Sequence, residues 1–157
     1  MREFQVVGGL VDGILAVAHP ELYRSAIGLM AKLFADHPPS RAVVAQWPSC
    51  YSAVQIIANR ESIRHRDVSA TPGWLDFLLM LGSYGETAVM EFWNLGASVP
   101  YDAGSVVLLS ARLVVHGVPK VPADRVCLAL YMDEHVFDWA KTAKAAMSNV
   151  QRDVIGR

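Results

Sequence analysis

The pattern of short strands and turns is clearest in residues 105–132, SVVLLSARLVVHGVPKVPADRVCLALYM. Short apolar runs alternate there with Gly, Pro and Asp, the residues that form turns. The same texture extends upstream to Tyr51. Short strands separated by turns are typical of an all-β barrel or jelly roll and not of alternating β-α-β units. The runs expected to be strands are 53–57, 88–92, 97–100, 105–110, 113–115 and 126–132.

Two helices are expected ahead of and within this β region. His19-Pro20-Glu21 opens a pattern of apolar residues at three- and four-residue spacing, and Pro38-Pro39 ends it. Thr71-Pro72 has the form of a helix N-cap followed by proline in the first turn. This predicts a second helix that runs as far as Gly82.

The two ends of the chain are interpreted as support for the β region. Residues 4–18 are interpreted as one or two short β segments around glycines, and Val136–Val150 as a C-terminal helix. The predicted fold class is α+β, mainly β: a jelly roll with an N-terminal supporting helix, a helix after residues 65–67 and a C-terminal helix. We expect a single domain over 1–157, because this length suits one domain. Its expected parts are 1–50 for the helical and β support, 51–133 for the β core, and 134–157 for the C-terminal helix and tail.

Composition and charge exclude several classes of protein. Hydrophobic residues make up 53% and charged residues 18%, which is typical of a folded chain. The net charge is −1, so any contact with nucleic acid must come from a local basic patch. Cys50 and Cys127 fit neither a disulfide framework nor a zinc site, and are predicted to be buried thiols. The apolar segment Val6–Ala18 contains Asp12 and is too short to span a bilayer, so we expect an intracellular, soluble protein without a membrane partner. The oligomeric state is left open.

A metal site is predicted from His65-Arg66-Asp67 and His116. In an extended segment residues i and i+2 point to the same side, so His65 and Asp67 can chelate one ion. His116 ends another apolar run about fifty residues later. Two histidines and one carboxylate form the facial triad of non-haem Fe(II) oxygenases, whose three open positions accept 2-oxoglutarate and O2. Taken alone, the first pair fits a solvated turn equally well and His116 fits a core histidine better; their order on successive strands favours the metal.

Arg125 is the fourth element of this constellation. It lies nine residues beyond His116 and opens the apolar run Val126–Tyr131. A guanidinium matches a carboxylate bidentately and stays charged when buried, which suits the far carboxylate of 2-oxoglutarate. Taken alone, Arg125 is better explained as a surface charge near Asp124.

A longer pattern surrounds these residues. It consists of Asn59-Arg60, His65-Arg66-Asp67, Trp74-Leu75-Asp76, Leu81-Gly82-Ser83-Tyr84, Leu95-Gly96, Tyr101–Val107, His116-Gly117-Val118 and Asp124–Cys127. With this pattern the sequence resembles the TET/JBP oxygenase domain, in particular the branch that is abundant in fungal genomes. The resemblance is strong from about Tyr51 to Val136 and looser back to His19. It implies a double-stranded β-helix, Fe(II) and 2-oxoglutarate as cofactors, O2 as co-substrate, and oxidation of a methylated base, typically 5-methylcytosine.

The resemblance also implies roles for individual residues. His65, Asp67 and His116 would bind iron. Arg125 would pair with 2-oxoglutarate, and Asn59 would make a polar contact to the same co-substrate.

Three further residues are candidates for binding the substrate. A base in a duplex must leave the stack to reach the oxidant, and the aromatic residues Tyr84 and Trp74 would suit holding it. Aromatic residues near an apolar helix are, however, more often core residues. Arg66, together with Arg60 and Arg64, could meet a phosphate backbone, and a solvated loop explains these arginines equally well.

Two departures from the family pattern bear on the substrate more than on the iron. Ala103 replaces the usual Pro before Gly104, and Ala111 replaces a Gly, which would strain the backbone if φ were positive there. Two alternative functions therefore stay open. One is the same iron chemistry on RNA, protein or a small molecule, which the near-neutral charge favours slightly over duplex DNA. The other is a non-catalytic relic that acts as a binding domain, against which the complete ligand set argues. Residence in the nucleus is implied by the resemblance alone.

Overall fold

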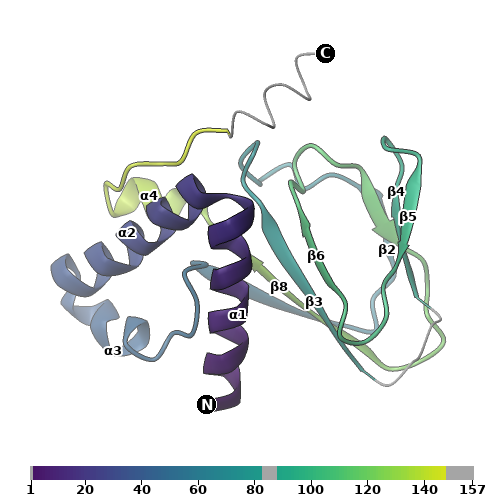
Figure 1. Ribbon diagram of the computed structural model, residues 1–157, viewed down its shortest axis with the longest axis horizontal. Helices are drawn as coiled ribbons and strands as arrows, with labels where there is room; N and C mark the ends of the chain where they lie inside the picture. The colour runs from purple at the N-terminus through teal and green to yellow at the C-terminus, as the bar shows by residue number, and fades with distance from the viewer. Residues whose placement is uncertain (1, 83–87, 148–157) are drawn as a thin grey trace. The chain divides into compact units, whose positions relative to one another are not determined.

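The computed structural model describes residues 2–82 and 88–147, with side chains from Phe4 onward. Its contacts divide the chain into two compact units, each described here by itself (Figure 1). Unit 1 comprises Met1–Ser52 and Met132–Arg157, and unit 2 comprises Ala53–Tyr131. The single domain expected over 1–157 stays a prediction. The elements are α1 (Arg2–Ala18), α2 (Pro20–Asp36), the 3-10 turn η1 (Pro38–Ser40), α3 (Arg41–Val44), β1 (Ala53–Ala58), β2 (Ser62–His65), β3 (Asp76–Gly82), β4 (Val89–Phe92), β5 (Ala97–Pro100), β6 (Val106–Leu109), β7 (His116–Val118), β8 (Arg125–Tyr131) and α4 (Glu134–Trp139).

The N-terminal segment of unit 1 is the helix α1, so the β segments predicted for residues 4–18 are wrong. Val11 and Leu15 are fully buried four residues apart, which is the spacing of one helix face. Gly8 marks a close approach and not a turn: a Cβ on it would lie 1.7 Å from the carbonyl oxygen of Pro48. Glycine lowers helix propensity by about 1 kcal/mol relative to alanine, and tertiary packing overrides this preference here.

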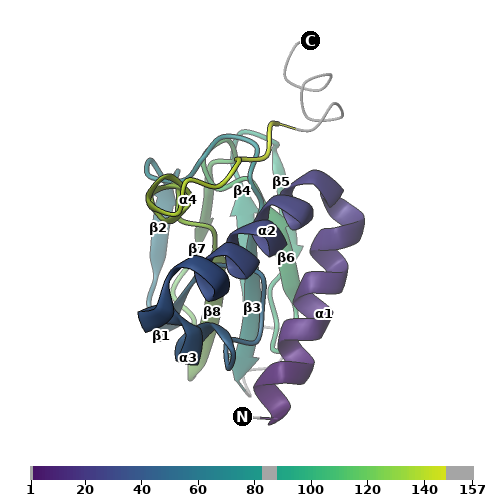
Figure 2. The ribbon, with the colours of Figure 1, turned by 90° about the vertical axis from the view of Figure 1, so that its left-hand side faces the viewer.

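The helix expected after His19 is confirmed as α2. His19 is its N-cap and accepts a hydrogen bond from the backbone N–H of Leu22 through Nδ1, at 3.3 Å. Pro20 occupies the first helical position, where its missing N–H is not needed. Figure 2 shows α1 and α2 joined at a corner, and by the bounds of the two helices His19 is the residue between them. The buried face of α2 consists of Leu22, Ala26, Leu29 and Leu33.

The C-terminal helix α4 is shorter than predicted. It begins at Glu134, behind the N-cap Asp133, and ends at Trp139; residues 140–147 are not helical, and the last residues of the predicted helix, 148–150, lie outside the described part of the chain. The chain leaves it through Lys141, which has a left-handed φ of 52°. The N–H of Lys141 donates to the carbonyl of Asp138, and the next N–H donates to the carbonyl of Phe137. This is the Schellman pattern, which ends many helices and usually contains a glycine. Lys141 takes the place of that glycine here, so the sequence pattern did not indicate the end of the helix.

Unit 2 consists of two four-stranded antiparallel sheets, which Figure 1 shows as separate layers. Sheet A has the strand order β1-β8-β3-β6, and sheet B has the order β2-β7-β4-β5. The inward faces of both sheets meet in one apolar cluster. Its buried members are Met80, Ala88, Met90, Tyr101, Val118, Cys127 and Ala129.

The helix predicted from Thr71 to Gly82 is wrong, because Asp76–Gly82 is strand β3 in the middle of sheet A. Phe77 and Met80, which point to opposite faces, are both fully buried. A continuous apolar run of this kind lacks the alternation of a half-exposed strand and cannot be told from a buried helix by periodicity. Its leucines and methionine also favour helix by intrinsic propensity.

The other predicted strands lie within two residues of observed strands, except for Leu113–Val115. These residues form a turn in which the N–H groups of Leu113 and Val114 donate to the carbonyl of Ser110. The strand begins one residue later, at His116. Cys50 and Cys127 are buried free thiols, as predicted.

The replacements at Ala103 and Ala111 do not strain the backbone. Among the described residues only Asn59 and Lys141 combine a side chain with positive φ. The adjacent glycine, Gly104, keeps the positive φ of 89° that its turn requires.

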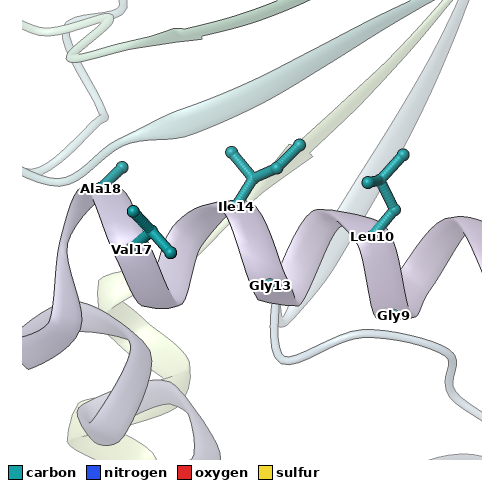
Figure 3. A pocket seen from close by; sticks show the side chains of 6 residues that line it. All are labelled: Gly9, Leu10, Gly13, Ile14, Val17 and Ala18. Atoms are coloured by element: carbon teal, nitrogen blue, oxygen red, sulfur yellow. The ribbon is translucent and has the colours of Figure 1, made fainter.

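An apolar groove runs along α1 in unit 1 (Figure 3). It is lined by Gly9, Leu10, Gly13, Ile14, Val17 and Ala18 and contains no titratable group. None of the helices in the described ranges combines the length and apolarity needed to cross a membrane.

Candidate metal centre

His65 and His116 are neighbours because β2 pairs with β7. The two residues are directly opposite in the register, and their ring centroids lie 4.4 Å apart. Nδ1 of His65 lies 2.7 Å from the carbonyl oxygen of Ile63, and Nδ1 of His116 lies 3.0 Å from that of Val114. A carbonyl can only accept, so each Nδ1 carries the proton and each Nε2 keeps its lone pair for a ligand.

Asp67 completes the group that we call the metal trio: His65, Asp67 and His116. Each member offers one ligand atom, and these three atoms lie within 4.8 Å of one another. The Oδ1 atom of Asp67 is 3.2 Å from Nε2 of His65. The backbone N–H of Asp67 donates to the carbonyl of Ala111 at 3.0 Å, which fixes the turn after β2. Two imidazoles and one carboxylate suit Fe(II), so the donor set fits the predicted metal.

Gly117 allows β2 to lie close to β7. A Cβ on Gly117 would be 2.9 Å from the carbonyl oxygen of Ser62 and 3.2 Å from the backbone nitrogen of Arg64. The register of β2 also shifts between Ser62 and His65, which marks an irregularity in the strand. The close contact and the shifted register together bring the His65 ring against His116.

Arg125 lies on the inward face of sheet A, as the alternation with Cys127 and Ala129 shows. It is only 5% exposed, and its guanidinium donates to the backbone carbonyl of Arg60. Among the described residues no carboxylate forms an ion pair with it. A buried guanidinium without an anion is costly, so this position fits a ligand that brings its own carboxylate.

Asn59 holds Arg125 in place instead of reaching toward a ligand. Its side-chain oxygen accepts from the backbone N–H of Arg125 at 2.7 Å, and its amide donates to Asp124 at 2.9 Å. Its own backbone N–H donates to the carbonyl of Arg125 at 2.9 Å, and its φ of 51° is left-handed. These contacts give Asn59 a structural role behind Arg125, and its contact to the co-substrate stays a prediction.

The three candidates for binding the substrate have different outcomes. Trp74 is 3% exposed, so it is a core residue and its ring is not available to stack on a base. Tyr84 lies outside the described residues. Arg66 is exposed between His65 and Asp67, and its role stays a prediction.

A cation–π pair on the outer face of sheet B was not predicted. The guanidinium carbon of Arg64 lies 3.2 Å from the ring centroid of Trp93. Arg64 is on β2 and Trp93 directly follows β4, and these two strands lie on either side of β7. Trp93 is 46% exposed, so this pair presents a cation and an aromatic ring to solvent one residue away from His65.

Asp76 is the main residue that sequence reasoning missed. Burial, and next the charge of Asp67, raise the pKa of Asp76 to about 7. The sequence contains a signal, a lone carboxylate at the start of the apolar run FLLML. The prediction of a helix over this run concealed it, because the strand and not the helix turns Asp76 toward the barrel interior.

The comparisons with known proteins agree with this geometry. Residues 1–134 match the TET/JBP family, described as the oxygenase domain of the 2OGFeDO superfamily. The chain is also similar to a solved structure described as NgTET1 in complex with 5mC DNA, with a TM-score of 0.65 and 13% identity. That match covers 97% of this chain and 55% of the other, so this chain spans about half the length of its structural neighbour. The likeness bears out the predicted jelly roll. No curated protein matches the sequence.

Proposed function

Because this chain belongs to the TET/JBP family of the 2OGFeDO superfamily, which uses Fe(II) and 2-oxoglutarate, we propose that it oxidises a methylated base in nucleic acid. The base would be of the 5-methylcytosine type. The observation that carries the proposal is the metal trio, whose three ligand atoms lie within 4.8 Å of one another. The further assignment to a fungal branch stays a prediction.

The metal trio would hold the iron. The carbonyls of Ile63 and Val114 orient both imidazoles through Nδ1 and leave the Nε2 atoms for the metal. Three protein ligands leave open positions for the co-substrates. Bound iron and 2-oxoglutarate would supply the oxidising power, with O2 reduced and 2-oxoglutarate converted to succinate and CO2.

Arg125 would bind the far carboxylate of 2-oxoglutarate. Its charge is buried on the inward face of β8, on the face that also carries the apolar cluster. A carboxylate ligand would neutralise it in a setting where water cannot compete. Asn59 would act behind it as a positioning residue, because it fixes the backbone of Arg125.

A nucleic-acid substrate is supported by two observations. The structural neighbour was solved in complex with 5mC DNA. Exposed arginines also surround the metal turn in this chain: Arg60, Arg64 and Arg66. They would meet the phosphate backbone locally, which a net charge of −1 does not prevent. A duplex substrate would place the protein in the nucleus and would require the base to leave the stack.

A second candidate substrate class is favoured by the absence of a general basic excess, since the net charge is −1. RNA, a protein side chain or a small molecule would then be oxidised by the same iron chemistry. The dependence of affinity on salt separates nucleic acids from a protein or small-molecule substrate, because a polyanion held through several phosphates loses affinity steeply as salt rises. A binding domain without catalytic activity is the least favoured function, because the metal trio and Arg125 are all present.

The decisive test is an anaerobic titration of the protein with Fe(II) and 2-oxoglutarate. The chelated complex is expected to give a visible charge-transfer band that saturates. The band should be lost in His116→Ala and weakened in Arg125→Ala. His135→Ala and Arg24→Ala are matched controls, because both side chains are exposed and outside unit 2. A folded wild-type protein without a band would overturn the oxygenase proposal.

A further inference from the structure

Asp76 is a partly buried carboxylate on the inward face of unit 2. It alternates on β3 with Leu78 and Met80, which belong to the apolar cluster between the sheets. Across the sheet it pairs with Leu109, which is also buried. Within the described ranges, its side chain forms neither a hydrogen bond nor an ion pair. A carboxylate in such surroundings is costly unless something supplies a donor.

The end of β6 brings Asp76 close to the metal trio. The N–H of Asp67 donates to the carbonyl of Ala111, and the N–H of Gly73 donates to Oγ of Ser110 at 3.3 Å. Asp76 itself lies opposite Leu109. Three positions of the segment 67–76, its two ends and Gly73, are therefore attached to three consecutive residues, 109–111. The two carboxylates are near enough for the charge of Asp67 to raise the pKa of Asp76.

Neither the metal nor the co-substrate explains Asp76. The ligand group within 4.8 Å contains the metal trio and not Asp76. 2-Oxoglutarate and succinate are anions, which a carboxylate repels. The remaining ligand is the substrate, and a carboxylate selects an N–H group on it.

We propose that Asp76 accepts a hydrogen bond from the exocyclic amino group of the substrate base and thereby selects a 5-methylcytosine-type base over 5-methyluracil. This inference rests on the proposed function. The two bases carry the same methyl group and differ at position 4, where an amino group is replaced by a carbonyl oxygen. A site built to accept from N–H rejects an analogue that presents a lone pair there, because two acceptors then face each other.

The test uses two oligonucleotides that differ only in this base, 5-methylcytosine or 5-methyluracil. Oxidation of each is measured by mass spectrometry, and binding of each by fluorescence anisotropy with Fe(II) and 2-oxoglutarate under anaerobic conditions. The wild type should prefer 5-methylcytosine by about 10- to 100-fold. Asp76→Asn should lower activity and affinity for 5-methylcytosine and abolish the preference, because an amide can also donate to the carbonyl.

Two further variants control for misfolding of the asparagine variant and for the loss of any carboxylate in unit 2. Asp76→Ser removes the charge with a smaller side chain, in case the asparagine variant does not fold. Asp102→Asn is the matched control: Asp102 is a partly buried carboxylate in the turn whose Gly104 bonds Met80, away from the Asp76 end of β3. The control should keep the wild-type preference, and all variants should keep the charge-transfer band.

The outcomes separate this inference from the proposed function. If the wild type oxidises 5-methylcytosine and the Asp76 variants keep its preference, the role of Asp76 is wrong and the proposed function stands. If the wild type forms the band and neither binds nor oxidises either oligonucleotide, the nucleobase substrate is wrong and the inference falls with it. Equal losses for both bases in Asp76→Asn would also overturn the inference.

Discussion

Sheets A and B of unit 2 face the same interior and differ in their regularity. In sheet A, β3 and β8 are seven residues long and pair without a break over six consecutive positions. In sheet B, β7 has three residues, β2 has four, and their register shifts between Ser62 and His65. Both histidines of the metal trio come from sheet B, and Arg125 and Asp76 come from sheet A.

The two sheets therefore position their site residues in different ways. A long regular sheet places buried charges by strand alternation alone, because every second residue faces the interior. The short irregular sheet places its two histidines opposite each other next to a register shift, and the close approach of β2 to β7 depends on Gly117. Site residues of sheet B should therefore be sensitive to small backbone changes, and those of sheet A mainly to loss of the side chain itself.

The largest effect is expected from removing a ligand in sheet B. His65→Ala should lower the affinity for Fe(II), or for Co(II) as a stable substitute, by at least about 100-fold, because two ligands do not complete the site. Isothermal titration calorimetry measures this. An affinity within a few-fold of the wild type would show that His65 is not a ligand.

The second-largest effect is expected from removing the buried charge of Arg125 in sheet A. Arg125→Ala should weaken binding of 2-oxoglutarate by roughly 100-fold, and Arg125→Lys by roughly 10-fold, because lysine supplies the charge without the bidentate fork. Metal affinity in the absence of 2-oxoglutarate should stay unchanged in both variants. Parallel titrations of metal and co-substrate check this, and equal loss of both would point to misfolding of sheet A.

A single methyl group in sheet B tests the comparison directly. Gly117→Ala should destabilise the fold by about 1–3 kcal/mol and weaken metal binding by roughly 10-fold, because β2 must move away from β7. Gly13→Ala in α1 is the control: nothing lies within 4 Å of its added Cβ, so helix propensity should make it neutral or slightly stabilising. Chemical denaturation and metal titration of both variants give the answer. Unchanged metal affinity in Gly117→Ala would remove the proposed sensitivity of sheet B.

The smallest effect is the pH dependence that Asp76 gives the metal-free protein. Its pKa is raised from 3.8 to about 7 in the folded state, so the folded state binds more protons than the unfolded state between these values. The free energy of unfolding should therefore fall as pH rises from about 4 to 7, by on the order of 2–3 kcal/mol. Asp76→Asn should remove this decline and be more stable than the wild type at pH 8. Urea denaturation at pH 5.5 and pH 8 measures the difference, and equal pH profiles would contradict it.

Most strands of the barrel were predictable because turn residues delimit them, and β5 was predicted with its observed bounds. The order of His-x-Asp, the later histidine and Arg125, together with the family resemblance, led to the prediction of the metal trio from the sequence. The two segments that failed, residues 2–18 and 76–82, did so for different reasons. Glycines in 2–18 suggested β turns, although its apolar residues have helical spacing, and 76–82 is a continuous apolar run without the alternation of a strand. Packing of the surrounding chain decided between helix and strand there.

By itself the sequence determined the chemical inventory: two histidines and an aspartate able to bind iron, an arginine able to bind a carboxylate, and a β region to carry them. The fold was needed to show that Trp74 is a core residue, that Asn59 supports Arg125, and that Asp76 lies on the inward face of its strand. The physical reason is that burial and the lack of a partner are properties of a side chain's surroundings. Those surroundings are formed by strands that lie far apart in the sequence.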